Sequence, residues 1–257
     1  MKSTMMNVPL SLNHLLERAG TLFPATEIVS RRPDKSLVRH TFGEYHRRTR
    51  ALASALQGLG LQKGDRVATL CWNHHAHLEC YFGIPAAGGV MHTLNLRLSP
   101  DEIGWIAADA KDRFLVIDDV LLPLYRQFAH LHAFEKVIVF PFSGQPVPSE
   151  FTDYEQWIGA ADSTGFAYED HDENEAVAMC YTSGTTGVPK GVAIAHQNVT
   201  WLVGPLDAGL PPGPVWTQCH SPAFDFSAAG LPFRMPELFD HAHRFVFDLL
   251  GRDADFV

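Results

Sequence analysis

The sequence lacks paired cysteines and any excess of basic residues. Its four cysteines show no C-x-x-C spacing and mostly lie in apolar surroundings: Cys71, Cys80, Cys180 and Cys219. This distribution favours buried thiols in a reducing compartment over a disulfide framework. With 20 basic and 29 acidic side chains the net charge is -9, which argues against a general surface for nucleic acids or anionic membranes. Any attraction of phosphate therefore has to be local.

Long apolar runs are also absent. The longest, residues 80–91, is interrupted by Gly83, Pro85 and the pair Gly88 and Gly89. Residues 1–14 contain no continuous apolar core of the length that a signal peptide needs. We therefore expect a cytoplasmic protein without a membrane span. The content of 46% hydrophobic and 19% charged residues is typical of a folded domain.

Short apolar runs alternate with amphipathic segments before residue 140. Strands are expected at residues 66–71, 90–93, 114–118 and 136–140, and helices at residues 12–19, from 42, at 75–83, from 100, and at 121–128. Gly20 is expected to end the first helix, whereas Thr41 with Glu44 and Ser99 with Glu102 form capping boxes. The alternation predicts an α/β fold with a largely parallel sheet flanked by helices. Residues 140–174, rich in proline and then in acidic residues, are expected to form a surface connection.

Three arginines lie on the helix that follows Thr41. Arg47, Arg48 and Arg50 could form an anion site. On a capped amphipathic helix such residues more often form a solvated face, and we favour that interpretation.

A group of histidines lies further along the chain. His74 and His77 share a helix face and, with His75 and Glu79, could bind a metal ion. Neither an H-E-x-x-H pattern nor paired cysteines complete such a site, so we favour histidines without a metal.

A loop rich in hydroxyl groups and glycine lies between two apolar runs, residues 175–181 and 192–195, which predicts strand, loop and strand. The candidate binding residues of this loop are Thr182, Ser183, Gly184, Thr185, Thr186, Gly187 and Lys190. Its glycines allow successive N–H groups to turn inward and form a concavity that binds anions. The hydroxyls add short donors and the lysine adds a mobile positive charge, so the sequence predicts a polyphosphate site.

Two other interpretations of this loop are a Walker loop and an ordinary surface loop. A Walker loop needs four residues between its first glycine and a Gly-Lys-Ser/Thr ending, followed by a helix. Here Pro189 precedes Lys190 and a β-branched run follows, which excludes it. An ordinary surface loop is disfavoured, because four hydroxyls, two spaced glycines and a lysine in so short a span are hard to obtain by chance.

The segment YTSGTTGVPKGV, residues 181–192, resembles the phosphate-loop signature of the adenylate-forming superfamily. This superfamily includes acyl-CoA synthetases, the adenylation domains of peptide synthetases, and luciferases. The resemblance implies binding of ATP with Mg²⁺ and transfer of AMP to a small-molecule carboxylate, followed in the ligases by attack of a thiol such as that of CoA. It also implies that the loop holds the β- and γ-phosphates, while Lys190 neutralises charge that develops on pyrophosphate.

The regions on either side of the loop resemble different branches of this superfamily. Residues 41–70 and 91–118 are similar to acyl-CoA synthetases, particularly those of medium- or long-chain fatty acids. Residues 215–227 instead resemble a peptide-synthetase adenylation domain, in which Asp225 would pair with the α-ammonium group of an amino acid. Asp225 could equally be a loop or capping residue. Recombination within the shared motif would produce such a mixture, and we offer this as a hypothesis.

Later motifs of the superfamily are not found in the sequence. They are a Tyr-Gly-x-Thr-Glu segment, a Tyr-x-Thr-Gly-Asp segment and a C-terminal domain with its lysine. We therefore expect residues 1–257 to form one incomplete N-terminal AMP-binding domain of an acyl-CoA synthetase. Amino-acid adenylation and a catalytically inactive nucleotide-binding fragment are the alternatives. An apolar surface left uncovered by the rest of the domain would promote self-association.

Overall fold

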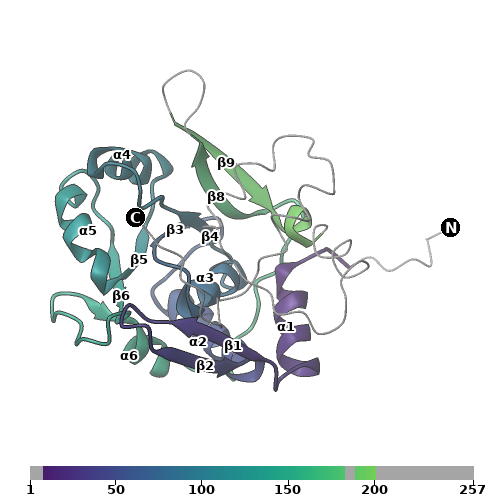
Figure 1. Cartoon of the computed structure of the whole chain (residues 1–257). Coiled ribbons are helices and arrows are strands. Elements are labelled where there is room, and N and C mark those ends of the chain that lie inside the picture. The colour runs from purple at the N-terminus through teal and green to yellow at the C-terminus, as the bar shows by residue number, and fades with distance from the viewer. Residues whose placement is uncertain (1–7, 183–188, 201–257) are drawn as a thin grey trace, which may run out of the picture.

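The computed structural model describes residues 8–182 and 189–200 (Figure 1). A seven-stranded sheet has the order β7-β6-β5-β3-β4-β8-β9, and every neighbouring pair is parallel except β8 and β9. Its strands are β3 (Arg66–Leu70), β4 (Val90–Thr93), β5 (Phe114–Asp118), β6 (Lys136–Phe140), β7 (Thr152–Asp153), β8 (Ala176–Thr182) and β9 (Lys190–Ala195). The predicted α/β fold with a largely parallel sheet is thus confirmed.

Helices cover both faces of this sheet. The helices are α1 (Leu12–Leu22), α2 (Phe42–Gly58), α3 (His75–Ala86), α4 (Pro100–Ala110), α5 (Leu122–Phe128) and α6 (Tyr154–Gly159), with a 3-10 turn η1 (Asp119–Leu121) before α5. Side chains alternate along β3, so Val67 belongs to a buried cluster with residues of α2, α3 and α6, whereas Ala68 and Leu70 belong to another with residues of α4 and α5. Parallel strands buried on both faces need continuous apolar runs, which these segments supply. None of the described helices is long and apolar enough to cross a membrane.

Helix α1 and a small hairpin lie at the side of the main sheet. The hairpin pairs β1 (Glu27–Arg31) with β2 (Leu37–Thr41). Leu12 of α1 packs against Val177 of β8 and Ile194 of β9. The N-terminal part of the chain therefore supports the last two strands of the sheet.

The predicted end of α1 at Gly20 is wrong, because the helix continues to Leu22. A Cβ atom at Gly20 would lie 2.4 Å from Cγ of His46 on α2. The glycine therefore permits close packing of two helices instead of ending one. Helix α3 likewise passes the expected end at Gly83 and includes Pro85.

Both predicted capping boxes are present, at Thr41 with Glu44 and at Ser99 with Glu102. The surface connection expected at residues 140–174 is only partly correct, because β7 and α6 lie within it. Helix α6 was missed because it is short, and Tyr154 and Ile158 supply its buried side chains.

The interpretation of the arginines as a solvated face is wrong for two of the three. Arg48 forms ion pairs with Glu79 and Glu155 and exposes only 12% of its side chain. Arg50 binds Glu17 at 2.9 Å and lies against the ring of Phe166. Both guanidinium groups are held by protein carboxylates, so they do not form an anion site. Arg47 is exposed, as expected.

Candidate functional site

The candidate site lies at the open end of the β8–β9 hairpin. Thr182, the last residue of β8, is opposite Lys190, the first residue of β9, and Tyr181 is opposite Gly191. The predicted arrangement of strand, loop and strand is therefore confirmed. Figure 1 shows this end of the hairpin projecting beyond the neighbouring strand β4. Because β8 runs parallel to β4, the loop leaves the carboxyl edge of the sheet, where open α/β sheets bind ligands.

Two of the predicted binding residues can be placed. Thr182 is half-buried and Lys190 is exposed, so its ammonium group is accessible to a ligand at this edge. The other predicted residues lie outside the described part of the chain and stay predictions: Ser183, Gly184, Thr185, Thr186, Gly187 and Asp225.

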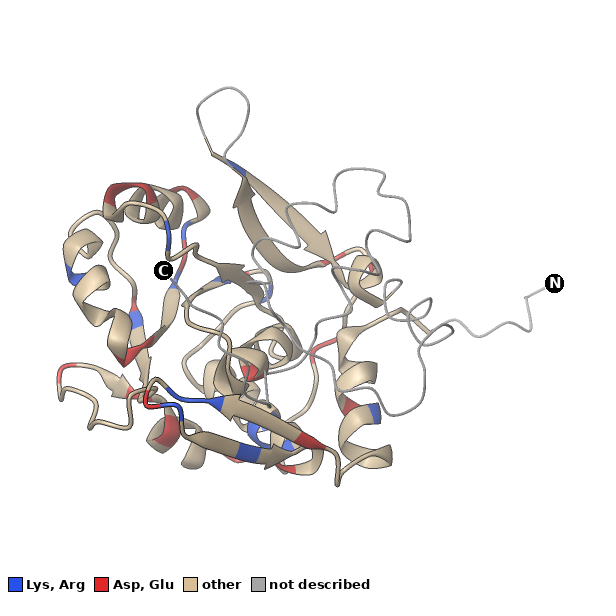
Figure 2. Ribbon diagram, viewed as in Figure 1, with Lys and Arg blue, Asp and Glu red and all other residues tan. Residues whose placement is uncertain are grey.

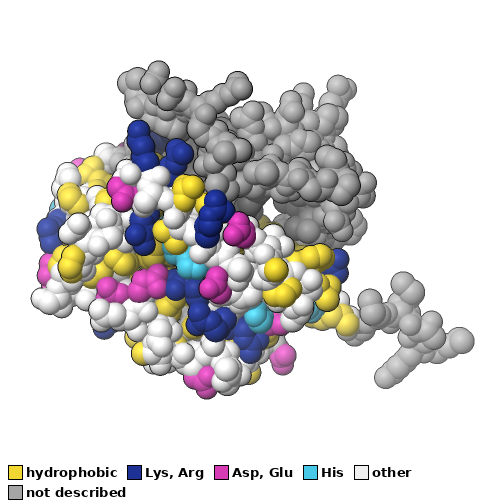
Figure 3. Space-filling view, turned by 60° about the horizontal axis from the view of Figure 1, so that its bottom comes forward, with side chains coloured by type: hydrophobic (Ala, Val, Ile, Leu, Met, Phe, Trp, Pro, Cys, Tyr) yellow, Lys and Arg dark blue, Asp and Glu magenta, His cyan; other side chains and the backbone are white. Residues whose placement is uncertain are grey.

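Basic and acidic residues are interspersed over the described ribbon (Figure 2). In Figure 3 the molecule is turned so that its lower side in Figure 1 comes toward the viewer, and this face shows the same mixture. One exposed pair, Arg39 with Glu27, has an N–O distance of 2.8 Å. Neither view shows one large basic field on the described residues.

The side chain of Tyr181 fastens the end of β8 to helix α4. Its hydroxyl donates a hydrogen bond of 2.6 Å to Oδ2 of Asp109. Its ring lies 5.3 Å from the ring of His92 and 6.5 Å from that of Trp105, measured between centroids. Burial, together with the Asp109 carboxylate, raises the pKa of Tyr181, so the phenol keeps its proton and remains a donor.

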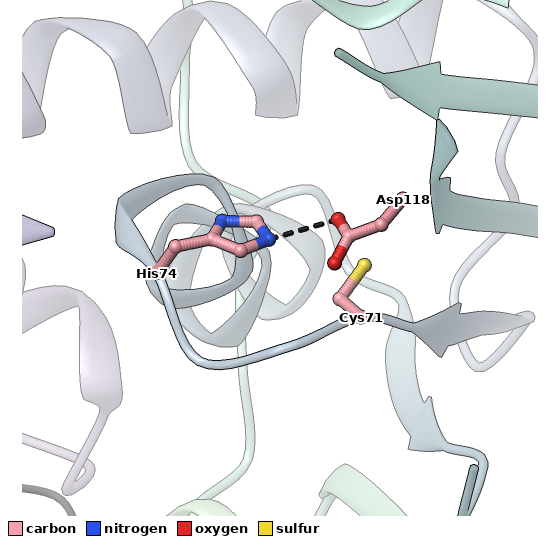
Figure 4. Close-up of side chains that lie close together, drawn as sticks. All are labelled: Cys71, His74 and Asp118. Atoms are coloured by element: carbon pink, nitrogen blue, oxygen red, sulfur yellow. Dashed lines mark hydrogen bonds and ion pairs between the residues drawn. The ribbon is translucent and has the colours of Figure 1, made fainter. Parts of the chain in front are cut away.

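A second cluster lies at the carboxyl ends of β3 and β5, where the strand order reverses. The ligand atoms of Cys71, His74 and Asp118 all lie within 4.8 Å of one another, and all three residues are buried (Figure 4). Sulfur, imidazole nitrogen and carboxylate oxygen are donors that zinc accepts, and the position is one where doubly wound sheets bind ligands. The cluster was not predicted, since Asp118 is far from the histidines in sequence.

The hydrogen bonds of this cluster argue against a metal ion. The backbone N–H of His77 donates to Nδ1 of His74, so the ring proton lies on Nε2 and is donated to Oδ1 of Asp118 at 2.8 Å. The other oxygen of Asp118 accepts the backbone N–H of Trp72. Binding a metal through Nε2 would put a proton on Nδ1, facing the His77 N–H donor. His74 instead caps α3 and ties it to β5 through Asp118, while the Cys71 thiol donates to the carbonyl oxygen of Val116.

The other histidines of this segment are also buried. Burial lowers the pKa of His77 to about 3, and it lowers the pKa of His75 further. Their rings are therefore neutral, and each contacts a hydroxyl group, that of Thr69 for His77 and that of Ser30 for His75. The interpretation of these histidines as residues without a metal stays a prediction.

Comparison with known proteins identifies the family of this chain. A model of the family "AMP-binding enzyme" matches residues 16–233. The chain belongs to the AMP-binding enzyme family. The resemblance to the adenylate-forming superfamily is thereby confirmed, and the β8–β9 hairpin with its connecting loop is the part of this AMP-binding chain that carries the signature.

The relatives of this AMP-binding chain include named ligases. It is 42% identical over 196 residues to a long-chain-fatty-acid–CoA ligase of Thermus thermophilus. The matched region covers 76% of this chain and 35% of the relative. It is 37% identical over 206 residues to a medium-chain-fatty-acid–CoA ligase of Ectopseudomonas oleovorans, covering 77% and 37%. The chain thus spans little more than a third of the length of these relatives.

Two solved structures of similar fold are named as CoA ligases. The anthranilate CoA ligase AuaEII in complex with anthranoyl-AMP matches with a TM-score of 0.67 and 26% identity, covering 84% of this chain and 39% of that one. A benzoate CoA ligase from Burkholderia xenovorans matches with a TM-score of 0.65 and 20% identity over 81% of this chain and 39% of that one, a likeness of fold alone.

Proposed function

We propose that this chain is the N-terminal part of an AMP-forming acyl-CoA ligase that activates a fatty acid with ATP and Mg²⁺ before transfer to CoA. The observation that carries this proposal is the hairpin end, where Thr182 and Lys190 are directly opposite each other on either side of the signature loop. The identity of 42% to a long-chain-fatty-acid–CoA ligase supports the fatty-acid substrate. In this proposal residues 1–257 form one AMP-binding domain.

The proposed chemistry uses positioning and electrostatics. A carboxylate oxygen of the fatty acid attacks the α-phosphorus of ATP, and the bond to pyrophosphate breaks. The hydroxyl and N–H groups of the loop would hold the β- and γ-phosphates, and Lys190 would neutralise the charge that develops on the leaving pyrophosphate. The thiol of CoA then attacks the acyl carbonyl, loses its proton and releases AMP.

The donor set of the hairpin fits the metal that such a reaction uses. Hydroxyl oxygens such as that of Thr182 are hard donors, and Mg²⁺ in nucleotide sites is held mainly by phosphate oxygens, water and few protein groups. When bound, the ion would neutralise part of the triphosphate charge. Among the described residues, Thr182 would place its hydroxyl group near the ion, and Lys190 would place its ammonium group beside the phosphate oxygens.

Amino-acid adenylation is the second candidate, favoured by the Phe-Asp-Phe-Ser segment that contains Asp225. An unpaired buried carboxylate would be costly beside a fatty acyl tail, whereas a substrate ammonium group would compensate it. This candidate keeps the phosphate chemistry of the hairpin and changes the substrate only.

The test is carboxylate-dependent exchange of labelled pyrophosphate into ATP by the purified chain, with a fatty-acid panel and an amino-acid panel. Exchange with fatty acids alone supports the proposal, and exchange with amino acids alone supports the second candidate. No exchange with either panel from folded protein would contradict both for this chain and leave a nucleotide-binding fragment. Lys190→Ala is the control that separates exchange at this site from a contaminating enzyme.

A further inference from the structure

Tyr181 is held from several sides although it lies next to a loop. His92 on β4 packs against its ring, Trp105 on α4 meets it edge-on at 89°, and Asp109 on α4 accepts a hydrogen bond from its hydroxyl group. These contacts come from two elements that precede β8 in the chain by about 70 residues or more. An aromatic ring with one polar partner is well suited to fixing a strand end, because both its plane and its tip are constrained.

The partner strand leaves room for this ring. Gly191 is directly opposite Tyr181 in the register of β8 and β9. A Cβ atom at Gly191 would lie 3.2 Å from Cζ, 3.3 Å from Cε2 and 3.4 Å from the hydroxyl oxygen of Tyr181. A side chain at position 191 would therefore crowd the ring and require it to shift slightly, so the glycine belongs to the same arrangement.

His92 is itself fixed by a buried carboxylate. Nδ1 of His92 contacts both carboxylate oxygens of Asp112, at 2.9 and 2.8 Å, and both side chains are completely buried. The imidazole ring is thus held in one orientation beneath the ring of Tyr181. A chain of contacts leads from Asp112, just before β5, through His92 on β4 to Tyr181 at the end of β8.

We propose that Tyr181 is a positioning residue that sets the direction in which the β8–β9 hairpin presents Thr182 and Lys190 to a nucleotide. Its ring fixes β8 on His92 and Trp105, and its hydroxyl fixes the strand end on Asp109. Thr182 follows Tyr181 on β8 and is opposite Lys190, which precedes Gly191 on β9, so a displacement of Tyr181 is passed to the neighbouring pair. This proposal rests on the proposed nucleotide-binding function of the hairpin.

The experiment combines ATP titration calorimetry with backbone hydrogen exchange at Lys190 and Gly191, using the whole chain. Tyr181→Ala should weaken ATP binding about tenfold, and Tyr181→Phe, which keeps the ring, about threefold. In both variants the amides of Lys190 and Gly191 should exchange faster without nucleotide, more so in Tyr181→Ala. Tyr125→Phe is the matched control, because Tyr125 packs against Phe128, Phe134 and Phe151 away from the hairpin.

A further pair of variants separates positioning from general loss of structure. Asp109→Asn keeps an oxygen acceptor and should bind ATP like the unaltered chain, whereas Asp109→Ala should resemble Tyr181→Phe. The double variant Tyr181→Phe with Asp109→Ala should be no weaker than either single variant, since both remove the same contact.

Two outcomes overturn the proposal. The first is unchanged exchange at Lys190 and Gly191 in folded Tyr181→Ala. The second is additive loss of ATP affinity in the double variant. If the unaltered chain binds no ATP while exchange still rises in Tyr181→Ala, the proposed function fails and the fixing of the hairpin by Tyr181 stands.

Discussion

Arg48 and Glu79 form a two-pronged ion pair between helices α2 and α3. Nε of Arg48 lies 2.6 Å from Oε1 of Glu79, and Nη2 lies 3.2 Å from Oε2. Glu79 is completely buried and also accepts the hydroxyl proton of Tyr154 at 2.7 Å. Because Glu155 binds the outer side of Arg48, three helices meet at this guanidinium group.

Removing the arginine should destabilise the fold strongly. Arg48→Ala leaves the Glu79 carboxylate buried without its counter-charge, and we expect a loss of about 3 to 5 kcal/mol in the free energy of unfolding at neutral pH. Urea unfolding followed by circular dichroism measures the change. Arg47→Ala, on the exposed side of the same helix, is the matched control and should change stability by less than about 0.5 kcal/mol. Equal effects of both substitutions would contradict the importance of the pair.

The effect of Arg48→Ala should depend on pH. Burial raises the pKa of Glu79 above its ordinary value of 4.5, against the lowering effect of Arg48 and Tyr154. When folding raises the pKa of a carboxyl group, its contribution to the stability of the protein is present below the pKa of the unfolded state. This contribution is lost as the pH rises through the pKa of the folded state. Without Arg48 the ionised form of Glu79 is still less favourable, and at lower pH this carboxyl group can take up a proton instead. The loss of unfolding free energy in Arg48→Ala should therefore be smaller when the unfolding series is repeated at about pH 5. A loss independent of pH would contradict this account.

Zinc should not bind at Cys71, His74 and Asp118. The hydrogen bond from the His77 N–H keeps Nδ1 of His74 without a proton, and Nε2–H is donated to Asp118. Burial also raises the pKa of the Cys71 thiol, so forming a thiolate ligand there would cost additional free energy. Dialysis against zinc followed by elemental analysis should find no stoichiometric metal that depends on His74. A bound equivalent that disappears in His74→Ala would show the prediction to be wrong.

The capping box at the start of α2 should contribute measurably to stability. Thr41 accepts the Glu44 N–H through its hydroxyl, and the Thr41 N–H donates to the Glu44 carboxylate at 2.8 Å. Thr41→Ala should cost about 1 kcal/mol in urea unfolding, whereas Thr41→Ser should cost little. The backbone bond from Thr41 lowers the pKa of Glu44, so its contribution is present above about pH 4.5 and is lost as pH falls through the lowered pKa.

Lys190→Ala should weaken binding of ATP by about 1 to 3 kcal/mol, because a charge-assisted contact to phosphate is lost. Titration calorimetry measures the affinity, and Lys190→Arg, which keeps the charge, should retain most of it. Lys136→Ala, at an exposed position on β6, is the control for a change of net charge. Unchanged affinity in Lys190→Ala would remove this lysine from the site.

Local features of the sequence were predicted well. All described strands of the sheet except β7 follow from short apolar runs, and the starts of α2 and α4 follow from the pairs Thr41 with Glu44 and Ser99 with Glu102. The hairpin around the loop was also predicted, because residues 175–181 and 192–195 bracket a segment rich in glycine and hydroxyl groups. These signals lie within a few residues of the structure that they specify, so periodicity and capping chemistry are sufficient to identify them.

Predictions that depended on distant partners were less successful. Arg48 and Arg50 have the spacing of a solvated face, and only the folded chain brings Glu79, Glu155 and Glu17 to them. Gly20 has the appearance of a helix end, yet it is a contact between α1 and His46. In each case the deciding neighbour is well separated along the chain.

The sequence by itself determined the α/β class, the parallel sheet and the family, since these depend on local periodicity and on one continuous motif. Only the tertiary structure decided what the individual polar groups do. It joined His74 to Asp118 in a satisfied cap instead of a metal site, and it fixed Tyr181 on Asp109 and His92 beside the loop. The physical reason is that burial makes each polar group depend on a partner, and the fold alone determines which residues become partners.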